Sequence, residues 1–324
     1  MTTGVFSSIE VVTEKMSNQW SGVAAWVAAV AACTAAFRSR KRRRKSIAGV
    51  KRIAILNLPG GYDYVPFFLN WFRRNGVHVV GQDPPSKAGA QTTPVYFKAF
   101  NFDRGEKPTS ISDFDGYVVT GSTCGVYESD PWIKELGDYI VRIHEKNIPM
   151  VGICFGHQII AHVLGGYAAK NPSGWELGAT SFNITEAATQ KLQQLLGTQQ
   201  AQSIPSSLPL QMVHGDAVLR LPEGFTSLGG THNTSIEGMI SNDLRVLTLQ
   251  GHPEFTNECV SEIVSKFESS IDTNVDHIGT HSNGLVSMLT QGYTKADVEA
   301  QAQVNVTESS DAVAKWCLAL FGIH

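Results

Sequence analysis

The sequence predicts an α/β fold in which helices cover both faces of a mostly parallel sheet. From Lys51 to about Gly166, apolar runs of strand length alternate with helical patterns, and this alternation is typical of parallel sheets. The chain has 324 residues, of which 42% are hydrophobic and 17% are charged. It is therefore long enough to bury a core of ordinary globular composition. Ligands of such sheets bind at the carboxyl ends of the strands.

Local signals support each element of the first half. Gly76 ends an amphipathic helical pattern, and Asp130-Pro131 opens another with a cap residue and a proline at the first helical position. Met150 to Ile153 is a short apolar run of the length of a buried strand, and Gly165 stops the helical pattern after it. The expected strands are 52–58, 77–80, 95–102, 114–120 and 150–153, and helices are expected at 64–75, at 130–146 and after residue 154.

The second half is richer in predicted strands. They are 176–184, 209–213 and a pair, 235–240 and 244–250, joined by the turn 241–243. Helices are expected at 254–269, 296–303 and 310–321, with 272–284 irregular. We expect three parts along the chain: an Ala-rich segment with a basic cluster (1–49), a main domain (50–270) and a C-terminal helical extension packed on that domain (271–324).

Cys154 stands between a predicted strand and a predicted helix, and Gly152 and Gly156 flank it. Small neighbours allow a sharp turn and the close approach of other groups. The thiol then lies over the first free amides of a helix, whose dipole favours the nucleophilic thiolate. This pattern is typical of a nucleophile elbow. A buried structural cysteine fits this stretch alone equally well.

A general base for Cys154 is offered by the sequence LQGHPEF, Leu249 to Phe255. His252 follows an apolar strand, and Glu254 comes two residues later. In extended backbone, residues i and i+2 point the same way, so Glu254 can accept a hydrogen bond from one ring nitrogen. The other nitrogen is then free to face Cys154. A solvated His and Glu in a loop is the alternative, and the strand before them together with the elbow upstream favours catalysis.

Four motifs together resemble the class I glutamine amidotransferases, which have a Cys-His-Glu triad. GICFGHQ (152–158) matches the family elbow, GHPEF (251–255) its H-x-E motif, VVTGS (118–122) the oxyanion turn and MVHGD (212–216) its H-x-D segment. The resemblance covers Lys51 to about Phe267 and includes stand-alone members, among them fungal glutamine amidotransferase-like proteins and plant γ-glutamyl peptidases. It implies a flavodoxin-like three-layer sandwich with a mostly parallel central sheet.

The resemblance also implies a role for each motif residue. Cys154 would attack the γ-carbonyl of a glutamine or γ-glutamyl group and form a thioester, which water then hydrolyses. His252 would move the proton to the departing amine, and Glu254 would orient His252. The developing oxyanion would lie between the amide of Phe155 and an amide of Gly121-Ser122.

We also expect roles for other residues in and near these motifs. Gln158 and His214 are expected to contact the substrate, although a loop role fits His214 equally well. The oxyanion turn reads Gly121-Ser122-Thr123, where synthetase-linked members have G-G-P, and only a backbone amide of Ser122 is required. Trp175 and Glu176 are expected to be structural. His157 and His162 are five residues apart and cannot share a helix face, so they are not predicted to form a metal pair. We predict no metal and no cofactor.

The N-terminal segment permits several interpretations. Trp20 to Phe37 is an uncharged Ala-rich run, about 27 Å long as a helix, and the basic sequence RSRKRRRK follows it. It could be a single-pass membrane anchor, which would place the catalytic domain in the cytoplasm. It could instead be an organelle-targeting peptide, a nuclear-localisation patch or a disordered tail.

The distribution of charge and the cysteine content argue against some classes of function. Nine of the 26 Lys and Arg lie in residues 38–52, whereas only two of the 29 Asp and Glu precede residue 53. The rest of the chain is therefore acidic and a poor match for nucleic acid. The 5 cysteines are odd in number, widely spaced and without a CxxC pair. This pattern predicts a reducing compartment rather than a disulfide framework or a zinc site.

Three functional hypotheses follow. The first is a free-standing hydrolase of γ-glutamyl amide bonds, a glutaminase or γ-glutamyl peptidase acting on glutamine, a glutathione-like molecule or a γ-glutamyl peptide. No SGGxDS-like pyrophosphatase motif occurs in the chain, which favours this hypothesis. The second is a glutaminase subunit that delivers ammonia to a separate synthetase in trans. The third is a non-catalytic interaction protein tethered by its N-terminus.

Overall fold

The computed structural model describes residues 49–60, 63–83, 92–197, 204–260 and 304–323. The chain divides into two compact units, Met1–Val50 and Lys51–His324, and the elements described here belong to the second. Within the described ranges, no helix is both long and apolar enough to cross a membrane. The Ala-rich run 20–37, the irregular segment 272–284 and the expected helix 296–303 lie outside the described residues.

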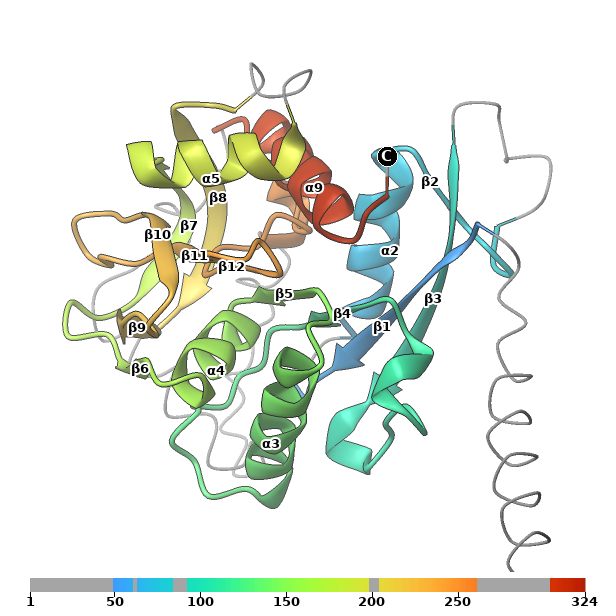
Figure 1. Ribbon diagram of the computed structural model, residues 1–324. Helices are drawn as coiled ribbons and strands as arrows, with labels where there is room; N and C mark the ends of the chain where they lie inside the picture. The colour runs from blue at the N-terminus through green and yellow to red at the C-terminus, as the bar shows by residue number, and fades with distance from the viewer. Residues whose placement is uncertain (1–48, 61–62, 84–91, 198–203, 261–303, 324) are drawn as a thin grey trace, which may run out of the picture. The chain divides into compact units, whose positions relative to one another are not determined.

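An eight-stranded sheet forms the centre of this unit, in the order β10-β11-β12-β5-β4-β1-β3-β2 (Figure 1). From β12 to β2 neighbouring strands are parallel, and β11 and β10 join antiparallel at one edge. The prediction of a mostly parallel sheet is confirmed. The bounds are β1 Lys51–Asn57, β2 Val77–Val79, β3 Thr93–Asn101, β4 Gly116–Val119, β5 Met150–Ile153, β10 Phe225–Gly229, β11 Gly238–Ser241 and β12 Val246–Leu249.

Two small antiparallel sheets accompany the large one. They pair β6 (Tyr167–Lys170) with β9 (Asp216–Arg220), and β7 (Glu176–Asn183) with β8 (Ser207–His214). In the described ranges the α-helices are α2 Val65–Arg74, α3 Pro131–Glu145, α4 Phe155–Val163, α5 Glu186–Leu196 and α9 Thr307–Leu320, with 3-10 turns at Phe102–Arg104 and Ile111–Asp113. Residues 257–260 are helical as well.

The central strands separate two hydrophobic cores, which gives a three-layer sandwich. Along β1, Ile53 and Ile55 face one core with α2 and α9, whereas Ala54 and Leu56 face the other with α3 and α4. Figure 1 shows these two helix pairs on opposite faces of the sheet. The alternation follows from the two-residue period of a strand, and it explains why the central strands are apolar throughout.

Several elements differ from the sequence prediction. Helix α5 and strands β6, β9 and β10 were not predicted. Residues 257–260 are helical, but the chain from Glu254 to Thr256 is not, so the predicted helix start at Glu254 is wrong. The structural reason is that His252 and Glu254 are held by contacts of their own, and a helix can begin only after them. The rest of 261–269 lies outside the described residues.

Three neighbouring strands determine where the motif residues meet. β4, β5 and β12 lie side by side and run parallel. Gly121 follows β4, Cys154 follows β5, and His252 follows β12. Because the carboxyl ends of parallel strands meet at one edge of the sheet, three segments far apart in the sequence converge there.

Candidate active site

Cys154 has an unusual backbone conformation. It is the N-cap of α4, with φ +55° and ψ −108°, and a positive φ is strained for a residue that carries a side chain. The side chain is 6% exposed, and its Sγ atom lies 4.0 Å from the carbonyl oxygen of Val213. The sharp turn predicted between strand and helix is present, and it presents the sulfur at the amino end of α4.

The turn needs glycine on both sides of Cys154. A Cβ atom built at Gly156 would lie 2.2 Å from the backbone oxygen of Val119, and one built at Gly152 would lie 2.6 Å from the oxygen of Gly156. The Gly156 amide donates to the carbonyl of Thr120 at 3.1 Å. The start of α4 therefore packs directly on the end of β4, an approach that no larger residue permits.

His252 and Glu254 form a buried pair. The Nδ1 atom of His252 lies 2.7 Å from Oε1 of Glu254, and each residue is 3% exposed. The His252 amide donates to the carbonyl of Gln211 on β8 at 2.8 Å. The ring of Phe255 stacks on the imidazole with a centroid distance of 4.2 Å. These contacts fix both the position and the plane of the imidazole.

The charges around His252 raise the pKa of its imidazole. Burial lowers its pKa, but the opposite charges of Glu254 and Cys154 and the hydrogen bonds to both raise it, with a net result of about 10. Since Nδ1 is bonded to Glu254, Nε2 is the ring nitrogen left for Cys154. His252 is therefore an imidazolium at neutral pH, next to the carboxylate of Glu254 and the sulfur of Cys154.

The segments proposed for the oxyanion hole flank the same site. Phe155 is the first residue of α4, so its amide has no carbonyl partner four residues earlier in the helix. Gly121 lies against His252, because a Cβ built on it would be 3.2 Å from Cε1 of the imidazole. The Thr120 hydroxyl donates to the carbonyl of Gly121 at 3.1 Å, and the Ser122 hydroxyl donates to the carbonyl of Pro59. Side-chain hydrogen bonds thus hold the Gly121-Ser122 turn in place.

Gln158 is buried beside the elbow. Its Nε2 atom donates to the carbonyl of Asp216 at 2.9 Å and to Oε1 of Gln250 at 3.1 Å. Both amide hydrogens are therefore used inside the protein and tie α4 to the segment after β8. A substrate contact by Gln158 stays a prediction.

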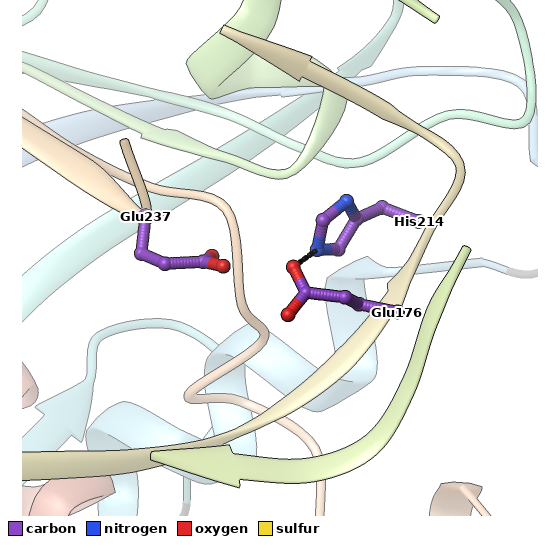
Figure 2. Close-up of side chains that lie close together, drawn as sticks. All are labelled: Glu176, His214 and Glu237. Carbon is purple, nitrogen blue, oxygen red and sulfur yellow. Dashed lines mark ion pairs between the residues drawn. The ribbon is translucent and has the colours of Figure 1, made fainter. Parts of the chain in front are cut away.

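His214 lies in a second buried cluster with Glu176 and Glu237, shown in Figure 2. The Nε2 atom of His214 is 3.4 Å from Oε2 of Glu176. Burial raises the pKa of Glu237, and the neighbouring Glu176 raises it further. Burial also opposes ionisation of Glu176, but the neighbouring His214, Glu237 and Thr234 hold the pKa of Glu176 low. Sequence reasoning missed Glu237, because no motif marks it and its partners are distant in the chain.

Comparisons with known proteins identify the family of the chain. A family model described as glutamine amidotransferase class-I matches residues 87–267. Gamma-glutamyl peptidase 5 of Arabidopsis thaliana is 32% identical over 156 residues, which are 48% of this chain and 60% of that protein. A glutamine amidotransferase-like protein of Schizosaccharomyces pombe is 32% identical over 154 residues, 47% of this chain and 57% of that protein. The matches thus span about three fifths of the length of these two relatives.

Two further comparisons concern a synthetase and the fold. The glutamine-hydrolyzing GMP synthase chain of Sulfolobus acidocaldarius is 32% identical over 144 residues, 44% of this chain and 69% of that protein. The crystal structure of a glutamine amidotransferase from Thermotoga maritima aligns with a TM-score of 0.59 and 17% identity, covering 84% of this chain and 98% of the other. At that identity the structural match supports the fold alone, which is the flavodoxin-like sandwich expected from the sequence.

Proposed function

Because the chain belongs to the class I glutamine amidotransferase family, we propose that it hydrolyses a γ-glutamyl amide bond through a thioester on Cys154. One observation carries the proposal. Cys154 and His252 follow the neighbouring parallel strands β5 and β12, Cys154 contributes to the raised pKa of His252, and Nδ1 of His252 lies 2.7 Å from Oε1 of Glu254. Nucleophile, proton carrier and orienting carboxylate are the three parts that such catalysis requires.

The first step makes the thioester. The sulfur of Cys154, as thiolate, attacks the side-chain carbonyl carbon of the γ-glutamyl group, and an S–C bond forms. When the C–N bond breaks, His252 gives its Nε2 proton to the departing nitrogen. A pKa of about 10 keeps that proton in place at neutral pH, and Glu254 keeps the ring oriented toward the site.

Backbone amides stabilise the charge that develops in this step. The amide of Phe155 and one from the Gly121-Ser122 turn donate to the oxyanion. Each such donor contributes about 3 kcal/mol to transition-state stabilisation in comparable enzymes. The hydrogen bonds from Thr120 and Ser122 that hold the turn support this role, since an oxyanion donor is effective only when it is fixed beforehand.

The second step releases the acid. After the amine leaves, neutral His252 takes a proton from water, and the resulting hydroxide attacks the thioester carbonyl. The S–C bond breaks, the thiolate returns to Cys154, and the γ-carboxylic acid departs. His252 is again an imidazolium, so protons and charge balance over the cycle.

The names of the relatives suggest the substrate class. The plant relative is called a gamma-glutamyl peptidase, so we propose γ-glutamyl amides and peptides as substrates. The test is hydrolysis of glutamine, glutathione and γ-glutamyl dipeptides by the wild type and by Cys154→Ala. We expect turnover of at least one substrate by the wild type and none by the variant. A wild type inactive on the whole panel, or a fully active variant, contradicts the proposal.

A second function is favoured by the likeness to the glutamine-hydrolyzing GMP synthase chain. In this alternative the protein is a glutaminase component, and ammonia released at Cys154 passes to a separate synthetase. Affinity purification of the full chain from its own source separates the two. A synthetase recovered in stoichiometric amount, with glutaminase activity that depends on it, would support the alternative and contradict a free-standing hydrolase.

A further inference from the structure

Three acid–base side chains, from β7, from β8 and from the residue before β11, meet inside the domain. Glu176 begins β7, His214 ends β8 opposite it, and Glu237 immediately precedes β11. Their exposed fractions are 3%, 3% and 0%. One ligand atom of each lies within 4.8 Å of the others, and Figure 2 shows the three side chains pointing into one common space.

The Nδ1 atom of His214 is hydrogen-bonded to the backbone. Nδ1 lies 3.0 Å from the carbonyl oxygen of Asp216. A carbonyl can only accept, so Nδ1 carries the hydrogen. The opposite nitrogen, Nε2, has no hydrogen-bond partner and points at the carboxylate of Glu176. A backbone carbonyl on one ring nitrogen with the other free is the usual arrangement of a metal-binding histidine.

The two carboxylates also lack a compensating cation. Hydroxyls of Thr231 and Thr234 donate to the two oxygens of Glu176. The Oε2 atom of Glu237 has no partner although its side chain is fully buried. In the described part of the chain, no Lys or Arg forms an ion pair with either carboxylate. Buried carboxylates are normally paired or coordinate a metal.

We propose that Glu176, His214 and Glu237 form a binding site for a divalent transition metal ion, with Zn²⁺ as the best match. Two carboxylate oxygens and one imidazole nitrogen are ligands that Zn²⁺ accepts at about 2.0–2.2 Å. The three ligand atoms lie within 4.8 Å of one another, so binding an ion requires them to move inward. The two positive charges of the ion balance the two carboxylates, which a single shared proton does not.

The position of the site indicates a supporting role. The carbonyl of Val213, the residue before His214, is 4.0 Å from the sulfur of Cys154. A metal bound to the cluster would join β7, β8 and the start of β11 behind the nucleophile. It would hold the segment against which Cys154 lies. The proposal does not depend on the chemistry assigned to Cys154.

The test is calorimetric titration of the full chain with Zn²⁺ alone, after removal of metals with a chelator. Because Cys154 and His252 can themselves bind zinc, the titration uses Cys154→Ala and compares it with Cys154→Ala combined with Glu237→Gln. We expect one tight equivalent in the first protein and at least tenfold weaker binding in the second. Zn²⁺ at 100-fold excess over Kd should raise the Tm of the first protein by about 5 °C. Equal binding by both proteins, or none by the first, overturns the proposal.

X-ray absorption at the zinc edge of the Cys154→Ala protein provides a readout that does not need the double variant to fold. We expect one imidazole nitrogen with oxygen ligands and no sulfur. A sulfur ligand, or two or more imidazoles, would place the ion elsewhere and contradict the assignment.

Discussion

The Nδ1 atom of His252 lies 2.7 Å from Oε1 of Glu254, although only Pro253 separates the two residues. Both side chains are buried, and Glu254 comes from the same short segment after β12 rather than from a distant loop. The orientation of the imidazole therefore depends on local chain geometry, and that geometry is held in turn by β8, by Phe255 and by α9. Substitutions that disturb this geometry should alter catalysis even where they leave Cys154 in place.

The carboxylate of Glu254 should be essential for turnover. Glu254→Gln keeps the shape but removes the charge and allows the wrong tautomer of His252. We expect kcat/KM on γ-glutamyl substrates to fall by about 100-fold or more, as in other enzymes with an oriented histidine. The matched control is Glu258→Gln, an exposed carboxylate nearby, which should retain near-wild-type kinetics. Similar activity of the two variants would contradict the role of Glu254.

Folding stability should depend on pH through His252. Its pKa is about 10 in the folded chain and about 6.5 when unfolded. The raised pKa means that the contribution to stability is fully present below pH 6.5 and is lost as pH rises toward 10. The free energy of unfolding from urea titrations should therefore fall across that window in the wild type. In His252→Asn the decline should be much shallower, and an unchanged slope would contradict the raised pKa.

Gly156 should tolerate no side chain. A Cβ there would lie 2.2 Å from the backbone oxygen of Val119, and a backbone atom cannot move away easily. We expect Gly156→Ala to lower the free energy of unfolding by at least about 2 kcal/mol and to reduce activity, because the elbow shifts. Gly105→Ala is the control: Gly105 has φ +75° but open space around it, so its cost should stay near about 1 kcal/mol. Equal losses would show that packing on β4 is not the cause.

Ser310 should position the segment that carries His252 and Glu254. Its hydroxyl donates to the carbonyl of Pro253 and accepts from Arg74, and its own carbonyl accepts from Trp71 at 3.1 Å. Helices α9 and α2 thereby hold the loop between the two site residues. We expect Ser310→Ala to lower kcat several-fold with little change in KM and to move the alkaline limb of the pH profile. The neighbouring buried Ser309→Ala is the control and should leave that limb in place.

Most of the central sheet could be predicted from the sequence, because a strand is marked by the pattern of residues that are neighbours in the chain. Met150 to Ile153 and Val246 to Leu249 are apolar runs of strand length, and both became buried central strands. The helix expected at 310–321 is present as part of α9, in which Trp316 and Cys317 are buried. Helix α5 was missed, although Thr185 caps it through the amide of Ala188, because few of its residues are apolar and buried.

The residues of the candidate site also differ in whether the sequence could predict them. Cys154, His252 and Glu254 could be predicted from the sequence because the segments that carry them follow clear strand patterns. The parallel arrangement of these strands then brings the segments to one edge of the sheet. Glu237 could not, because its importance depends on Glu176 and His214, which reach it only through the pairing of β7 with β8 and the placement of β11. Ser310 is likewise far from Pro253 in sequence, and no local pattern marks that contact.

The most direct test of the central claim is detection of the acyl-enzyme. Wild-type protein mixed with a γ-glutamyl substrate, quenched with acid during turnover and digested, should show a mass increase of one glutamyl group on the peptide that contains Cys154. The adduct should be absent from Cys154→Ala and should disappear when the substrate is exhausted. Steady turnover without any adduct on that peptide, together with unchanged turnover by Cys154→Ala, would contradict a thioester mechanism at this residue.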